Sequence, residues 1–144
     1  MINYWQRLKK YYRFEKMNEV LTVLYAEDEA DIREITQFAL EDEGFQLTEC
    51  ASGQEALDRA TTLTPDLILL DVMMPGMDGP TTLVKLRKLP HLAKTPVIFM
   101  TAKIQPDELE KYKALGAAGV ISKPFDPLTL ADKIRALIDR GIHD

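Results

Sequence analysis

Acidic residues follow directly on two of the most apolar segments of the chain. Glu27 and Asp28 come after the β-branched run 20–26, and Asp71 comes after the apolar run 67–70. Runs of this length and composition predict strands, and 67–70 is typical of a strand buried on both faces of a parallel sheet. The carboxyl ends of parallel strands meet at one sheet edge, where ligands bind. We therefore expect the three carboxylates to converge, which without a cation would be repulsive.

A hydroxyl and an ammonium are predicted at the same edge. Thr101 ends the strand 96–100, and Lys123 follows the short strand 119–122. Carboxylate and carbonyl oxygens can hold a divalent cation such as Mg²⁺. With a hydroxyl and an ammonium on the opposite side, a phosphoryl group can bind between them and the cation. The histidines, His91 and His143, lie outside this set, but a carboxylate nucleophile needs no base because it is already ionised. The pattern thus indicates metal-assisted phosphorylation of a carboxylate.

Taken singly, each of these residues has a simpler interpretation. Asp71 could start a turn, and Glu27 with Asp28 could be a charge pair at a helix N-terminus. Thr101 could merely end a strand, and Lys123 could be a surface lysine. Their joint occurrence at successive strand ends favours the chemical interpretation.

Helix signals separate the predicted strands. The first helix is expected to be capped by Asp31 with Glu34, to present Ile32, Ile35 and Ala39 to the core, and to end at Gly44. The further strand and helix signals are, in order, a strand 45–50, a helix opened by Ser52 and Glu55 that stops before Pro65, a helix from Gly79-Pro80 to about Lys88, a helix from Pro106 to Gly116, and a helix opened by Asp126-Pro127 that reaches about Asp139. Five βα units with short, right-handed crossovers predict an α/β fold with a parallel sheet and helices on both faces.

Composition sets limits on the class of protein. The chain has 144 residues, 46% hydrophobic and 28% charged, which suits one soluble domain. A single cysteine, Cys50, and the absence of a long apolar run predict a cytoplasmic protein without internal disulfides.

The first 19 residues differ from the remainder. They carry five basic and two acidic side chains, and since the whole chain carries −5, residues 20–144 carry −8. An acidic body argues against direct nucleic acid binding. Aromatic residues are interleaved with the basic ones, and Ile2, Trp5, Leu8 and Tyr12 form a helical stripe. Such a segment could rest on a membrane surface or dock on a partner, but a mobile extension is the interpretation that we favour.

In combination these motifs resemble the receiver domain of two-component response regulators. The motifs that carry the resemblance are Glu27-Asp28, Asp71-x-x-Met74-Pro75-Gly76-Met77-Asp78-Gly79, Thr101-Ala102 and Lys123-Pro124-Phe125. The resemblance implies a flavodoxin-like, doubly wound (βα)5 fold with strand order 2-1-3-4-5. It divides the chain into an extension (1–19), a receiver domain (20–140) and a tail (141–144).

The resemblance also implies roles for individual residues. Asp71 would be the phospho-acceptor, with Thr101 and Lys123 bonded to phosphoryl oxygens. Mg²⁺, for which Mn²⁺ can substitute, would be held by Glu27, Asp28, Asp71 and the backbone carbonyl of Met73. The Lys123-Pro124 peptide bond would be cis.

A signalling function follows from the resemblance. A histidine kinase or histidine phosphotransfer protein would donate the phosphoryl group, and a protein effector would read the phosphorylated state. Such a protein is not an enzyme in the usual sense, although self-phosphorylation from small donors and autodephosphorylation are expected. Many receivers carry an aromatic residue three positions before the lysine, where this chain has Val120. The usual threonine–aromatic coupling therefore has no counterpart here, and the first acidic position is Glu27 where aspartate is commoner.

Three alternatives remain open at this point. The chain could be a degenerate receiver that only docks, or one domain of a hybrid kinase or larger regulator. It could also be an aspartyl-nucleophile phosphohydrolase similar to the haloacid dehalogenase group. That group carries a second aspartate two residues after the nucleophile, where this chain has Met73, and a cap domain is missing.

Overall fold

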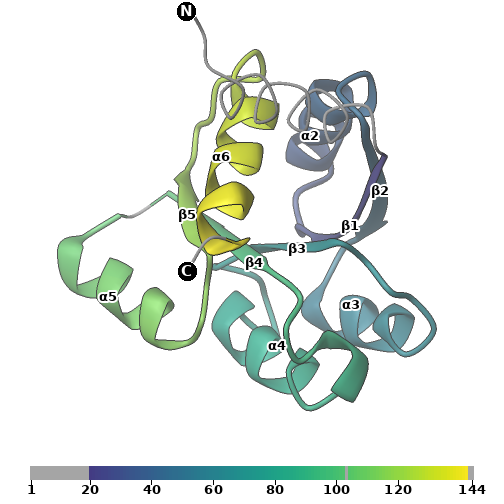
Figure 1. Cartoon of the computed structure of the whole chain (residues 1–144), viewed down its shortest axis with the longest axis vertical. Coiled ribbons are helices and arrows are strands. Elements are labelled where there is room, and N and C mark those ends of the chain that lie inside the picture. The colour runs from purple at the N-terminus through teal and green to yellow at the C-terminus, as the bar shows by residue number, and fades with distance from the viewer. Residues whose placement is uncertain (1–19, 103, 143–144) are drawn as a thin grey trace, which may run out of the picture.

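The computed structural model describes residues 20–102 and 104–142. The predicted amphipathic stripe of the first 19 residues, Lys103 and the last two residues lie outside this range. Within it, the chain forms one five-stranded parallel sheet with helices on both faces (Figure 1).

All five predicted strands are present. They are β1 (Leu21–Ala26), β2 (Phe45–Cys50), β3 (Leu67–Asp71), β4 (Val97–Thr101) and β5 (Gly119–Ser122). Their order in the sheet is β2-β1-β3-β4-β5, and every neighbouring pair is parallel. The order that the resemblance implied is thereby confirmed, and β3 stands at the centre.

The helices form two layers. Above the sheet in Figure 1 lie α2 (Ala30–Glu41) and α6 (Leu130–Ile142). Below it lie α3 (Gly53–Ala60), α4 (Gly79–Leu86) and α5 (Pro106–Ala114), and a short 3₁₀ helix, η1 (Pro90–Leu92), precedes β4. Successive side chains of a strand point to opposite faces. Leu67 and Leu69 accordingly pack with α2 and α6, and Ile68 and Leu70 with α3 and α4.

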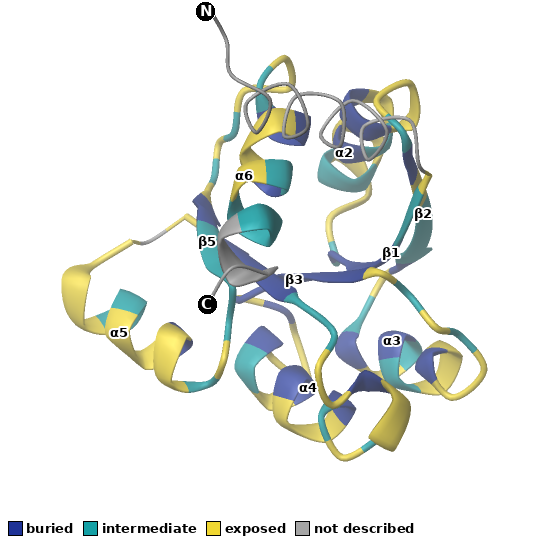
Figure 2. Cartoon of the chain, in the orientation of Figure 1, coloured by how far each residue is buried: buried dark blue, intermediate teal, exposed yellow. Residues whose placement is uncertain are grey.

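The central strand is buried along its whole length, as Figure 2 shows for the sheet interior. All five residues of β3 are at most 4% exposed, including Asp71. A strand covered on both faces cannot alternate apolar and polar side chains. Its uniform apolar run is therefore explained, and the sheet holds Asp71 on a rigid element.

Some predicted helix ends are confirmed. The Ser52 hydroxyl accepts a hydrogen bond from the amide of Glu55 at 3.0 Å, and the Glu55 carboxylate accepts one from the amide of Ala51 at 2.9 Å. Asp78, immediately before Gly79-Pro80, caps α4 by accepting a bond from the amide of Thr81 at 2.8 Å. Gly116 ends the turn after α5 with a φ of 88°.

Two predictions for α2 were wrong. The helix begins at Ala30, with Glu29 at the cap position and no side-chain cap bond, so Asp31 lies inside the first turn. Ile35 is 46% exposed, because the face that meets the sheet is formed by Thr36, Ala39 and Leu40. Thr36 was overlooked for that face because it is polar, but its hydroxyl is bonded to the carbonyl of Ile32 and to the Tyr25 hydroxyl.

The last helix begins later and ends later than predicted. The Asp126 carboxylate accepts a bond from the amide of Leu128, and its carbonyl accepts one from the amide of Thr129. These local bonds make a turn rather than a helix. Consequently α6 begins at Leu130, and it extends to Ile142, beyond the expected end near Asp139.

Candidate functional site

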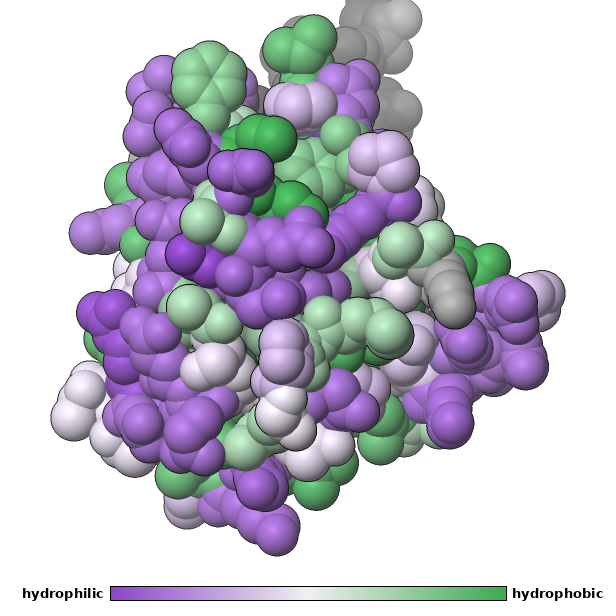
Figure 3. All heavy atoms as spheres, turned by 180° about the vertical axis from the view of Figure 1, so that it is seen from behind, coloured by the Kyte–Doolittle hydropathy of each residue, from purple (hydrophilic) through white to green (hydrophobic). Residues whose placement is uncertain are grey.

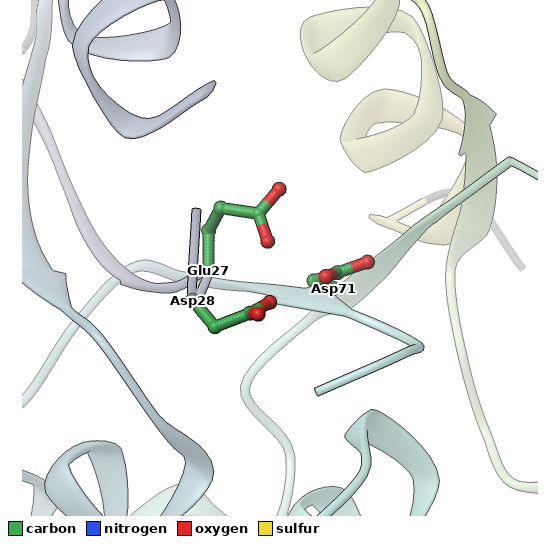
Figure 4. A group of neighbouring side chains, drawn as sticks. All are labelled: Glu27, Asp28 and Asp71. Carbon is green, nitrogen blue, oxygen red and sulfur yellow. The ribbon is translucent and has the colours of Figure 1, made fainter. Parts of the chain in front are cut away.

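The predicted chemical residues lie at the carboxyl edge of the sheet. Glu27 and Asp28 directly follow β1, Asp71 ends β3, Thr101 ends β4, and Lys123 follows β5. Register explains this placement, since Ala26 pairs with Leu70 and Thr101 pairs with Ser122. Figure 4 shows Glu27 and Asp28 leaving adjacent positions of the chain, with Asp71 beside them.

The three carboxylates are as close as the sequence predicted. One oxygen from each of Glu27, Asp28 and Asp71 lies within 4.8 Å of the others. Glu27 is 1% exposed and Asp71 4%, whereas Asp28 is half-buried. Burial, and after it the neighbouring Asp71, raise the pKa of the Glu27 carboxyl from 4.5 to about 8, although Lys123 opposes the rise. Ionising all three carboxylates without a bound cation is therefore unfavourable.

Lys123 supplies one positive charge. Its Nζ atom lies 2.6 Å from Glu27 Oε1 and 3.2 Å from Asp71 Oδ1, and its side chain is 15% exposed. Burial alone would lower the pKa of this ammonium, but the hydrogen bond to Glu27 and the charge of Asp71 outweigh it and hold the pKa above its usual value. The Lys123-Pro124 bond is cis, as the resemblance predicted.

Thr101 is 2% exposed at the end of β4. Its carbonyl accepts a hydrogen bond from the amide of Lys123 at 2.9 Å, so the two residues are fixed side by side through the backbone. Thr101 and Lys123 therefore both lie at the β4–β5 side of the sheet edge, and the lysine reaches across to Glu27 and Asp71. Met73 lies in the loop after β3 with its side chain 69% exposed, and the role of its carbonyl as a ligand stays a prediction.

Two contacts that support the site were not predicted from the sequence. The Arg33 guanidinium on α2 donates a hydrogen bond to the carbonyl of Glu27 at 2.6 Å, which fixes the turn that carries the acidic pair. Gly79 was part of the motif after Asp71 and was expected to start a helix, but its contact with the backbone of Asp71 was not predicted. A Cβ atom there would lie 2.5 Å from the carbonyl oxygen of Asp71, so only glycine allows α4 to begin this close to Asp71. No periodicity or charge pattern signals contacts of this kind.

The donor set fits a hard divalent cation. Among the described residues, Glu27 Oε2 is a buried side-chain oxygen without a hydrogen-bond partner. An orphaned carboxylate oxygen beside two further carboxylates is a poor arrangement for the protein alone and a suitable one for Mg²⁺, which prefers oxygen ligands. Glu27, Asp28 and Asp71 are the residues that would hold it.

Comparison with known proteins identifies the family. The family model for the response regulator receiver domain matches residues 23–135. The chain belongs to the response-regulator receiver family. Receiver domains are the response-regulator part of two-component systems, and the fold and the clustered carboxylates of this chain are those that the resemblance implied.

Curated relatives of this receiver are transcriptional regulators. It is 37% identical over 127 residues to the transcriptional regulatory protein CseB of Streptomyces avermitilis, covering 88% of this chain and 53% of the relative. It is 36% identical over 118 residues to the phosphate regulon regulator PhoB of Escherichia coli, covering 82% and 52%. The chain therefore spans about half the length of the curated relatives that it matches.

Solved structures of similar receivers share the fold over nearly their whole length. The chemotaxis protein CheY4 of Vibrio cholerae superposes with a TM-score of 0.78 at 32% identity, covering 82% of this chain and 98% of that one. The receiver domain of the Francisella response regulator 1452 gives a TM-score of 0.74 at 31% identity, covering 83% and 98%. Within the described part of the receiver, no helix is both long and apolar enough to cross a membrane.

Proposed function

We propose that this receiver accepts a phosphoryl group on Asp71 and signals by a change in protein contacts. The observation that carries the proposal is the convergence of three carboxylates and one lysine, with Asp71 at the centre of the sheet edge. Histidine kinases or histidine phosphotransfer proteins are the proposed donors, and the proposed reader is a protein effector.

The transfer step needs no general base. A carboxylate oxygen of Asp71 attacks phosphorus, a P–O bond forms, and the P–N bond of the donor phosphohistidine breaks. The leaving imidazole nitrogen then takes up a proton from solvent. Lys123, 3.2 Å from Asp71 Oδ1, stabilises the added negative charge, and the buried Thr101 hydroxyl offers a donor to a phosphoryl oxygen. Held by Glu27, Asp28, Asp71 and the Met73 carbonyl, Mg²⁺ would neutralise charge on the phosphoryl oxygens.

The same groups support phosphorylation by small donors and hydrolysis of the phosphorylated product. Small acyl phosphates can replace phosphohistidine, because the acceptor and its charge-stabilising groups all come from the receiver. Water attack on the aspartyl phosphate returns the Asp71 carboxylate and inorganic phosphate, which is autodephosphorylation. A receiver that only docks would not need the buried Glu27–Lys123 pair, which is costly to desolvate.

Labelling with acetyl phosphate tests the assignment. In the presence of Mg²⁺ the wild-type protein should take up one phosphoryl group, and Asp71→Asn should take up none. Asp66→Asn is the matched control, because Asp66 lies at the opposite end of the same strand, where it accepts hydrogen bonds from Thr22. Stoichiometric labelling of Asp71→Asn would show that another carboxylate is the acceptor.

The proposed ligand set has a separate test. Calorimetric titration with Mg²⁺ should give weaker binding in Asp28→Ala than in wild type, because a carboxylate of the cluster is lost. Unchanged Mg²⁺ affinity in that variant would show that the ligand set is wrong even if Asp71 is phosphorylated.

A further inference from the structure

The outer face of α2 carries apolar side chains that the domain does not cover. Phe38 is 74% exposed and Ile35 46% exposed, one helical turn apart. Val20, just before β1, is 61% exposed. In the upper part of Figure 3, which shows the molecule from behind, hydrophobic residues lie among hydrophilic ones. Covering an exposed aromatic ring with a docked segment removes apolar surface from water, which is favourable.

The charges around these side chains are acidic. The exposed acidic residues of α2 and the turn after it are Asp31, Glu34, Glu41, Asp42 and Glu43. Two basic side chains of this region, Arg33 and Arg135, are bonded to backbone carbonyls. Arg33 donates to the carbonyl of Glu27, and Arg135 of α6 donates to the carbonyl of Glu43 and lies over the Phe45 ring. Among the described residues, none of these five carboxylates forms a salt bridge, so the face combines an apolar stripe with an acidic border.

One segment of this chain has the complementary chemistry. Residues 1–19 carry a net charge of +3 and nine apolar or aromatic side chains, which are Met1, Ile2, Tyr4, Trp5, Leu8, Tyr11, Tyr12, Phe14 and Met17. Their periodicity allows a helix with Ile2, Trp5, Leu8 and Tyr12 on one face.

Chain connectivity places this segment at the correct end of α2. The amide of Leu21 donates a hydrogen bond to the carbonyl of Gly44 at 2.8 Å, so the start of β1 lies beside the turn that follows α2. The helix has 12 residues, or about 18 Å of length, and 19 residues span about 28 Å even as a helix. The segment can therefore run along the whole of α2 from its C-terminal end, with no linker to order first.

We propose that residues 1–19 dock on the outer face of α2 of their own chain. Apolar side chains of the segment cover Phe38 and Ile35, and its basic residues face the acidic border. The occupant is intramolecular, because attachment beside Gly44 gives it a high effective concentration at this face.

Trp5 makes the proposal directly measurable, since it is the only tryptophan of the chain. In the full-length protein, acrylamide should quench Trp5 fluorescence less than it quenches N-acetyltryptophanamide. Phe38→Gln should raise the quenching constant about twofold or more, because the largest apolar contact is removed. Val84→Gln is the control, since Val84 is 47% exposed on α4, in the opposite helix layer, and should leave quenching unchanged. Circular dichroism checks that both variants stay folded.

Several results would overturn the proposal. If acrylamide quenches wild-type Trp5 as strongly as the free analogue, the segment does not dock. If Trp5 remains protected from acrylamide in Phe38→Gln, it does not dock on this face. Protection that disappears on dilution would identify a second copy as the partner. A blue shift of Trp5 emission that needs phosphatidylglycerol vesicles and is the same in Phe38→Gln would identify a membrane surface instead. Protection that is independent of protein concentration and lost in Phe38→Gln alone supports the intramolecular contact.

Discussion

Lys123 Nζ lies 2.6 Å from Glu27 Oε1 and 3.2 Å from Asp71 Oδ1, so one ammonium bridges the two most buried carboxylates of the site. The ammonium thereby offsets part of the negative charge of these two carboxylates. The contact also links β5 to β1 and β3 across the sheet edge, so a change at Asp71 alters the balance of charge that holds Lys123.

Removing this ammonium should destabilise the metal-free protein. In EDTA, Lys123→Ala should lower the free energy of unfolding by about 1–3 kcal/mol, less than for a fully buried pair because the lysine remains 15% exposed. Saturating Mg²⁺ should stabilise the variant more than the wild type, since the lysine no longer competes for Glu27 and Asp71. Urea unfolding with and without Mg²⁺ measures both effects.

Lys113→Ala is the matched control for that experiment. Lys113 forms an exposed pair with Glu110 at 4.0 Å, and its loss should change stability by less than about 1 kcal/mol. A Lys123→Ala variant that is more stable than wild type in EDTA, or that gains no more from Mg²⁺, would contradict the bridging role.

Thr101, rather than Val120, should couple phosphorylation to α5. Val120 is half-buried against the lower core and has no ring to reorient, so Val120→Ala should cost about 1 kcal/mol of stability and leave the response intact. Thr101→Ala should still accept phosphate but show smaller NMR shift changes along α5 when beryllofluoride is added. The opposite pattern, with Val120→Ala unresponsive and Thr101→Ala like wild type, would reverse the pathway.

The cap of α4 should give a pH-dependent contribution to stability. Hydrogen bonds from Thr81, through its side chain and then its amide, lower the pKa of Asp78 below its ordinary value of 3.8. A lowered pKa in the folded state means that this stabilisation is complete above 3.8 and is lost as pH falls through the lowered value. At neutral pH, Asp78→Ala should cost about 1 kcal/mol.

The comparison with Ser52→Ala isolates the effect of charge. Ser52 caps α3 with a hydroxyl that does not ionise, so the cost of its removal should be the same at neutral and at acid pH. Denaturant unfolding of both variants across this pH range gives the measurement. An Asp78→Ala cost that does not shrink at acid pH would show that the carboxylate charge is irrelevant to the cap.

The single thiol should be unreactive in the folded protein. Cys50 is 1% exposed, and burial, with a smaller contribution from Glu55, raises its pKa to about 11 from 9.0. The thiolate is the reactive form, so Ellman's reagent at neutral pH should react about 100-fold more slowly with folded than with urea-unfolded protein. Rapid labelling under native conditions would show that the end of β2 opens readily.

Sequence patterns were sufficient for the sheet and for the placement of the acidic edge. The topology follows from the apolar strand segments, the glycine and proline residues between them and the alternation of βα units. This topology alone brings Glu27, Asp28, Asp71 and Lys123 together. Parallel strands all end at one edge, so no side-chain detail is needed to predict that convergence.

Other features depend on contacts between elements and could not be predicted. Ile35 points outward because Thr36 is bonded to Tyr25 across the helix–strand interface, and no helical periodicity reveals that preference. The contact of Gly79 with the backbone of Asp71 and the bond from Arg33 to Glu27 likewise join residues whose proximity exists only after folding. The turn at Asp126 was mistaken for a helix start because aspartate favours both.

Identification of the modified residue is the most direct test of the central claim. Borohydride reduces an aspartyl phosphate to homoserine, which peptide sequencing then locates. After phosphorylation with acetyl phosphate and Mg²⁺ and reduction, homoserine should be found at position 71 and at no other position. Homoserine at position 28 or at any other aspartate, or a phosphorylated protein that yields none, would contradict the assignment of Asp71 as the phospho-acceptor.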